Sequence, residues 1–310
     1  MKPVMYHYVR PQASGLPYFP HLALSDFECQ LDHFEECCGF VGREDFLAWV
    51  AGAPAPEGAL LTFDDGLRDH LDYVLPSLAK RGIFGLFYVS SGPALTGEIL
   101  DVHKVHLAVG RIGGEAALRW LKQEAPDLIP TETSATHYTA QNSDQATKIV
   151  KDLFNYRLSP KERGPVLDRL LDHAFKGSPP SWRDIYLDQD DLRELSRAGM
   201  GVGAHSHKHL LSGRLPAEEE KAEIELSCAF VETAGGGRGF GYCYPYGSFS
   251  VRTEATVAAA GCPFAFGVAG ADISEPLAET ARYALPRHNC NVFPHGTASF
   301  GEATAPARSS

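Results

Sequence analysis

Several features are scarce in this 310-residue sequence, and each scarcity excludes a class of protein. Basic residues form no long run and the formal net charge is −11, so we expect no nucleic-acid partner. No apolar stretch is long enough to span a bilayer, and residues 1–10 are too polar for a signal peptide. We therefore expect no integral membrane segment and a cytoplasmic location.

Cysteine also occurs without an organised pattern. The seven cysteines are scattered, odd in number and free of any C-x-x-C pair. This argues against a disulfide framework and against a cysteine zinc site, and it favours a reducing compartment. The hydrophobic content of 44% and the mean hydropathy of −0.18 fit a globular chain with a substantial core.

Strand-like and helix-like segments alternate along most of the chain, which favours a parallel α/β sheet or barrel. The expected strands are residues 4–9, the apolar run 59–61 with its end at Asp64-Asp65, 83–89, 200–204, 239–244 and 263–268, followed by an extended piece at 282–288. The first expected helix has Ser25 as its N-cap. Further helices are expected over residues 43–51, 70–81, 188–198, 217–234 and 251–260.

Residues 98–180 interrupt this alternation. The segments 101–122, 143–156 and 160–174 all have helical periodicity, which predicts a helical insertion. We expect residues 1–300 to form one barrel domain that carries this insertion, and residues 301–310 to form a disordered tail.

Two adjacent carboxylates follow the apolar run 59–61, at the end of an expected buried strand. Like charges so close together resist joint ionisation, and a metal ion or a shared proton relieves this. A turn signalled by Asp65-Gly66 is the alternative role for one of them. Because side chains alternate along a strand, one of Asp64 and Asp65 can bind a metal while the other accepts a proton.

A histidine-rich segment follows a second apolar run, residues 200–204. His205 and His209 can face one ion from a single turn of chain, whereas His207 is expected to point elsewhere. Such tracts also occur on surfaces without a function. Combined with a carboxylate at another strand end, however, two imidazoles are what a divalent metal with an open water position requires. The sequence therefore predicts a metal-dependent hydrolase.

A third segment, residues 240–247, places aromatic residues at a strand end before Pro245 and Gly247. It can form a substrate wall, and a backbone N–H in its turn can face a developing oxyanion. A packed aromatic strand end is the alternative.

These segments resemble the polysaccharide deacetylase family, also called carbohydrate esterase family four. Its motif T-F-D-D-G matches Thr62–Gly66 in full, and H-[S/T]-x-x-H matches His205–His209. The third motif, usually R-x-P-Y, is met only partly by Cys243–Tyr246. The resemblance covers about residues 1–92 and 185–290 and excludes the helical insertion.

The resemblance implies a distorted (β/α)7-type barrel with a divalent metal, zinc first among the ions that this ligand set admits. By position in the motifs, Asp65, His205 and His209 would bind the metal and Asp64 would be the general base. The backbone N–H of Tyr246 would stabilise the tetrahedral oxyanion.

The sequence also departs from the family pattern. Cys243 stands where the family has the arginine that orients the base, and Arg287 is a candidate replacement. The Asp-Trp fourth motif is not recognisable. The general acid is expected to be His288, in an L-x-x-H segment, or else His295, while His7 ends the first strand and can face the barrel mouth.

Together, these patterns predict an enzyme that removes an N-acetyl group from a sugar or glycoconjugate, such as an intermediate of surface-polysaccharide synthesis. Hydrolysis of another C–N amide bond, in an N-formyl sugar or a cyclic ureide, is an alternative on the same fold. A non-catalytic, carbohydrate-binding relative is another. The sequence leaves the substrate, the metal and the oligomeric state open.

Overall fold

A computed structural model describes residues 1–129, 137–138, 143–277 and 282–301. The chain divides into two compact units. Unit 1 comprises Met1–Arg10, Leu22–Glu98 and Trp182–Thr297, and unit 2 comprises Pro11–His21, Ile99–Ser181 and Ala298–Ser310. Apart from Gly301, the expected disordered tail lies outside the described residues.

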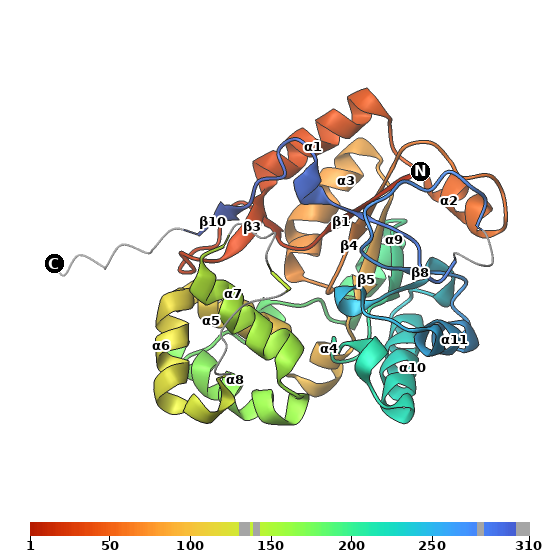
Figure 1. The fold of residues 1–310 in the computed structure, drawn as a ribbon. Coiled ribbons are helices and arrows are strands. Elements are labelled where there is room, and N and C mark those ends of the chain that lie inside the picture. Colours follow the sequence, from red (N-terminus) through yellow and green to blue (C-terminus); the bar gives the residue numbers. More distant parts are fainter. Residues whose placement is uncertain (130–136, 139–142, 278–281, 302–310) are drawn as a thin grey trace. The chain divides into compact units, whose positions relative to one another are not determined.

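A seven-stranded sheet, which includes the strands β1, β4, β5 and β8 labelled in Figure 1, forms the centre of unit 1. Every neighbouring pair of its strands is parallel. In spatial order the strands are β8 (Ala265–Phe266), β7 (Tyr242–Cys243), β6 (Gly201–Ala204), β5 (Gly85–Val89), β4 (Ala59–Phe63), β1 (Lys2–Tyr6) and β9 (His288–Asn289). The sheet is curled, and the α/β class with a distorted (β/α)7-type barrel is confirmed. The expected strand 239–244 is shorter than predicted, because Arg238–Phe240 form a 3-10 turn before β7.

The segment 282–289 connects the two edges of this sheet. The backbone N–H of Ala265 donates to the carbonyl of Arg282, and that of Gly267 donates to the carbonyl of Leu285. Three residues further on, His288 pairs with Val4 of β1. The segment therefore leaves β8 and pairs with β1 as the edge strand β9, and Arg287 lies between these two contacts.

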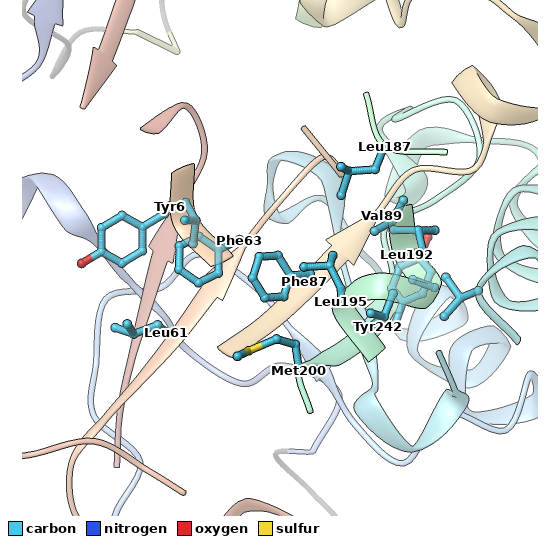
Figure 2. Packing of buried hydrophobic residues seen from close by; sticks show 14 of the residues in the cluster. Tyr6, Leu61, Phe63, Phe87, Val89, Leu187, Leu192, Leu195, Met200 and Tyr242 are labelled. Carbon is cyan, nitrogen blue, oxygen red and sulfur yellow. The ribbon is translucent and has the colours of Figure 1, made fainter. Parts of the chain in front are cut away.

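Side-chain alternation in β4 separates an outer face from an inner face. Leu61 and Phe63 belong to the large buried cluster in Figure 2, together with residues of β1, β5 and β6. Leu60 lies in a second buried cluster on the opposite face. Thr62 and Asp64 continue the Leu60 series, so the strand directs Asp64 to the inner face.

Most helices of unit 1 pack against the outer cluster, whereas the helix that carries Phe46 and Trp49 packs against the inner cluster around Leu60. The helices with bounds in unit 1 are α1 (Leu24–Cys37), α2 (Arg43–Val50), α3 (Leu75–Arg81), α4 (Gly92–Thr96), α9 (Gln189–Arg197), α10 (Ala217–Thr233) and α11 (Val251–Ala259). Phe27, Leu31 and Phe34 place one face of α1 in the outer cluster. The predicted N-cap Ser25 is wrong: α1 begins at Leu24 with Ala23 as N-cap, because β3 (Pro20–Ala23) runs directly into the helix.

Two other segments refine the expected pattern in unit 1. The expected helix 70–81 begins as a π-helical turn, His70–Val74, before α3. A short strand, β2 (Val9–Arg10), pairs in parallel with residues 22–23 of β3.

Unit 2 is mainly helical. It contains α5 (Asp101–Ile112), α6 (Gly114–Glu124), α7 (Gln145–Asp152), the π-helical turn Leu153–Arg157 and α8 (Pro160–Phe175), and β10 (Ser299–Phe300) pairs with residues 20–21. α5 packs against α8, and α6 packs against α7. The segment 101–122 is helical as expected but forms two helices, because Gly113, at a φ of 82°, separates α5 from α6. Among the described residues, every helix is too short or too polar to traverse a lipid bilayer.

Candidate functional site

Asp64 lies at the inner carboxyl end of β4 and pairs with a buried arginine. Nη1 of Arg287 donates to Oδ1 of Asp64 at 2.7 Å, and Nη2 donates to Oδ2 at 2.8 Å. The same guanidinium donates to Thr62 Oγ1 at 3.0 Å and to the Gly267 carbonyl at 3.1 Å. The structure thus brings Arg287, the candidate replacement for the missing motif arginine, into a bidentate contact with Asp64.

This pair keeps Asp64 ionised despite its burial. Burial alone would raise the pKa of Asp64, but the charge and the hydrogen bonds of Arg287 lower it to about 2. Cys243 lies beside the pair, with its Sγ 2.9 Å from Nη2 of Arg287 and 3.6 Å from Oδ2 of Asp64. Burial raises the pKa of the Cys243 thiol, so the thiol stays neutral next to the carboxylate.

Asp65 faces a different set of groups because the backbone turns between the two carboxylates. Asp65 has a φ of 77°, in the left-handed region that non-glycine residues rarely adopt. Its Oδ1 lies 3.3 Å from Nε2 of His205 and 3.2 Å from Nε2 of His209. All three side chains are buried. The metal ligands predicted from the sequence therefore converge on one point, and they come from the segments that follow β4 and β6.

The geometry of these three side chains fits a divalent metal. Two ligand atoms bound tetrahedrally to zinc, each at about 2.0–2.1 Å, lie roughly 3.3 Å apart, which matches both separations here. The ligand atoms of Asp65, His205 and His209 all lie within 4.8 Å of one another. One carboxylate and two imidazoles suit zinc and related ions.

Further contacts orient the two histidines. Nδ1 of His205 lies 2.8 Å from the carbonyl oxygen of Cys243, which can only accept. Nδ1 therefore carries a hydrogen, and Nε2 is the ring nitrogen that faces Asp65. Burial disfavours protonation of His205, but the interactions with Cys243 and Asp65 raise its pKa well above the usual value.

Two serines after β5 also contact the histidine segment, and sequence reasoning missed them. Ser90 Oγ donates to the carbonyl of His205 at 2.8 Å, and Ser91 Oγ lies 2.9 Å from Nδ1 of His207. His207 accordingly turns to Ser91 and away from Asp65. The available signal was positional: both serines follow a buried strand that lies between β4 and β6.

Tyr246 lies on the turn after β7, next to the candidate ligand His209. Its ring centroid is 4.7 Å from that of His209, in an edge-on arrangement. Its φ of 58° is also left-handed, so Asp65, His209 and Tyr246 all share this uncommon conformation. Such clustering of backbone strain is typical of functional sites.

The two histidines suggested as general acid are not near this cluster. Arg287 points inward, so the next residue, His288, points outward, where its Nε2 lies 2.7 Å from Oδ1 of Asp272. His295 is exposed in a loop. Neither position supports a role in proton transfer at Asp64.

His7 is better placed. Tyr6 pairs with Phe63 between β1 and β4, and the N–H of Asp64 donates to the Tyr6 carbonyl at 3.0 Å. His7 therefore stands beside Asp64 in register, and it contributes, after Arg287 and His205, to the lowering of the Asp64 pKa that opposes the effect of burial. Its carbonyl lies 3.0 Å from Nε2 of the buried His70, which fixes the backbone at this point.

Comparison with known proteins shows what this chain resembles. The family model described as polysaccharide deacetylase matches residues 166–265, which include the histidine segment and the turn at Tyr246. No curated protein sequence matches the chain.

Three solved structures share the fold at low sequence identity. The *Streptococcus pyogenes* deacetylase PplD, in complex with acetate, is 14% identical, with 96% of this chain and 95% of that chain covered and a TM-score of 0.59. IcaB from *Ammonifex degensii* is 17% identical, with coverage of 93% and 90% and a TM-score of 0.54. The BpsB deacetylase domain from *Bordetella bronchiseptica* is 16% identical, with coverage of 93% and 95% and a TM-score of 0.52. The resemblance to the polysaccharide deacetylase family is therefore confirmed.

Proposed function

We propose that this protein is a divalent-metal-dependent hydrolase that removes the N-acetyl group from an amino sugar in a saccharide or glycoconjugate. The observation that supports the proposal is that Asp64 and Asp65 face different chemical groups. Asp64 faces a guanidinium and remains an ionised carboxylate, whereas Asp65 faces two imidazoles in a ligand geometry. A base and a metal site at the same strand end are what metal-assisted amide hydrolysis requires.

Asp64 would act as the general base. It accepts the proton of the attacking water while Arg287 keeps the carboxylate ionised and fixed in orientation. A divalent ion held by Asp65, His205 and His209, zinc as the first expectation, would polarise the acetyl carbonyl and lower the pKa of the water, which offsets the weak basicity of Asp64.

Two further groups would complete the reaction. The backbone N–H of Tyr246, on the turn that packs against His209, would donate to the tetrahedral oxyanion. His7 would donate a proton to the departing sugar nitrogen, because it stands beside Asp64, whereas His288 is paired with Asp272. The products would be acetate and a free amine on the sugar.

Two findings support an N-acetyl sugar as the substrate. The matching family model is that of polysaccharide deacetylases, and the similar PplD structure contains acetate, the expected second product. We further propose that the substrate is an intermediate of surface-polysaccharide synthesis, as expected from the sequence.

The test is acetate release from N-acetylglucosamine oligomers. The protein would be treated with a chelator, dialysed and reconstituted separately with zinc, cobalt, nickel and manganese. We expect activity to disappear on chelation and to return with at least one ion, and Asp65→Asn to show no such recovery. Undiminished activity after complete metal removal would contradict the metal role.

The substrate arm of the same assay separates the alternatives. N-formyl sugars and cyclic ureides would be offered beside the N-acetyl oligomers. Formate release without acetate release would reassign the bond that is cut. Saccharide binding with no turnover, unchanged in Asp64→Ala, would instead identify a non-catalytic binding protein.

A further inference from the structure

A buried carboxylate outside the proposed ligand set contacts the turn that carries the two histidines. Glu223 lies on α10 and its side chain is 5% exposed. Its Oε2 accepts hydrogen bonds from Ser206 Oγ at 2.6 Å, from the His207 N–H at 3.1 Å and from the Lys208 N–H at 2.7 Å. A single oxygen thus gathers three donors from consecutive residues.

The turn that Glu223 holds is conformationally uncommon. Ser206 has a φ of 65° and His209 has a φ of 56°, both in the left-handed region. For residues with a Cβ this conformation is costly and persists only where surrounding contacts enforce it. Successive backbone N–H groups that converge on an anion form a nest, and the anion stabilises the turn that creates it.

The opposite side of the turn is held by the residues after β5. Ser90 Oγ donates to the carbonyl of His205, the Ser91 N–H donates to that of Ser206 at 3.2 Å and the Gly92 N–H donates to that of His207 at 2.8 Å. The carbonyl groups are therefore fixed by one element and the N–H groups by another. Glu223 is the member of this arrangement that contributes a negative charge.

We infer that Glu223 is a positioning residue for the metal centre. It holds residues 206–208 in the turn that aims His205 and His209 at one point, and its charge favours a cation nearby. This inference rests on the proposed metal-dependent function. The role of Glu223 does not require a contact with the ion or with the substrate.

The same helix offers a matched control, Glu220. Its side chain is fully buried, and it accepts hydrogen bonds from Thr253 at 2.7 Å, from Arg252 at 3.1 Å and from Thr256 at 3.3 Å. These donors belong to α11 and not to the histidine turn. Glu220→Ala and Glu223→Ala therefore both remove a buried carboxylate from α10, but only Glu223→Ala releases the turn.

The decisive measurement is zinc affinity, obtained by competition with a chromophoric chelator for the wild type, Glu223→Ala, Glu223→Gln and Glu220→Ala. We expect Glu223→Ala to weaken binding by about 10–100-fold, the range seen when groups behind the ligands are lost. Glu223→Gln should lose less, because its carbonyl oxygen can take the place of Oε2. Glu220→Ala should bind as the wild type does, although its thermal unfolding temperature falls.

Backbone hydrogen exchange provides a second readout that needs no metal. We expect faster exchange of the His207 and Lys208 amides in Glu223→Ala, and wild-type rates there in Glu220→Ala. If Glu223→Ala does not fold, Glu223→Gln and Ser206→Ala, which removes one donor only, test the same point with smaller expected losses.

The outcomes separate the inference from the proposed function. The positioning role would be overturned if Glu223→Ala bound zinc as tightly as the wild type does. It would also be overturned if Glu220→Ala and Glu223→Ala lost equal zinc affinity. Both results would leave the metal function intact. A wild-type protein that binds no divalent ion would overturn both.

Discussion

Asp64 and Asp65 are neighbours in sequence with the same side chain, yet their surroundings differ in every respect that matters to chemistry. Asp64 continues the inner face of β4 and receives two hydrogen bonds from a buried guanidinium. Asp65 follows a backbone turn at a φ of 77°, and its Oδ1 faces the Nε2 atoms of His205 and His209. One carboxylate already has a full positive charge beside it, whereas the other is arranged to share a cation.

This difference shows that backbone conformation, and not residue type, assigns the two roles. A regular strand would send the second carboxylate to the outer face, which is filled by the apolar cluster around Leu61 and Phe63. The positive φ of Asp65 avoids that burial among apolar groups and turns the side chain toward β6. Gly66, with a φ of 67°, continues the turn, and a Cβ there would lie 2.7 Å from Cγ1 of Val89. The glycine of the motif is therefore required by both conformation and space.

The largest expected effect is that substitution of Asp65 mainly lowers zinc affinity, whereas substitution of Asp64 mainly lowers kcat. Asp65→Asn should weaken zinc binding by at least about a hundredfold, more than residues behind the ligands typically contribute. Asp64→Asn should bind zinc nearly as the wild type does but lose about 10²–10⁴-fold in kcat, the usual range for a general base. Zinc titration and acetate release on the same preparations measure both. Equal metal loss in the two variants would show that the carboxylates act as one unit.

The next effect concerns Arg287, whose guanidinium lies beside Asp64. Arg287→Met leaves Asp64 buried without its partner, so its pKa rises and the acid limb of the kcat/KM profile moves to higher pH. The variant should also be destabilised by about 3–5 kcal/mol, as expected for a broken buried pair. The folded-state pKa of Asp64 is depressed to about 2, so its stabilising contribution is present above the unfolded pKa near 3.8 and is lost as the pH falls toward 2.

Arg10→Met is the matched control for this prediction. Arg10 makes a similar two-point contact, at 2.8 Å and 2.8 Å, with the buried Asp69, and neither residue belongs to the candidate ligand set. We expect a loss of stability in urea unfolding but no shift of the acid limb. A shift of similar size in both variants would show that stability, and not the charge at Asp64, sets the profile.

Much of this arrangement could be predicted from the sequence because the decisive signals are local. The apolar runs before Asp64 and His205 place both motifs at carboxyl ends of strands, and parallel strands bring those ends together. Alternating elements indicated the fold class, and helical periodicity indicated the helices α5 to α8.

The remainder depends on long-range geometry that local patterns do not encode. Arg287 reaches Asp64 only because the segment 282–289 joins the two edge strands, a closure that no spacing in the sequence reveals. The same closure turns His288 outward, against the L-x-x-H pattern. The position of His7 beside Asp64 likewise follows from the register of β1 on β4.

A smaller effect would test the proton donor. His7→Asn should lower kcat on N-acetylglucosamine oligomers by roughly 10²-fold, because an amine leaves poorly without a proton. The loss should be much smaller on 4-nitrophenyl acetate, whose leaving group needs no protonation. His288→Asn should stay near the wild type on both substrates, since His288 contacts Asp272. The reverse ranking would restore His288 as the general acid.

The smallest effect is expected at Cys243, which occupies the place of the family's motif arginine. Its Sγ lies 3.6 Å from Oδ2 of Asp64, a long contact for a weak donor, whereas Arg287 already supplies two short charge-assisted hydrogen bonds to the same carboxylate. Cys243→Ser should therefore change kcat by no more than about threefold, and the acid limb should stay in place, since the charge that lowers the pKa of Asp64 is unchanged. The pH profiles of Cys243→Ser and Arg287→Met, measured side by side, check this. A shift of the acid limb in Cys243→Ser would mean that the thiol, and not the guanidinium alone, sets the ionisation of Asp64.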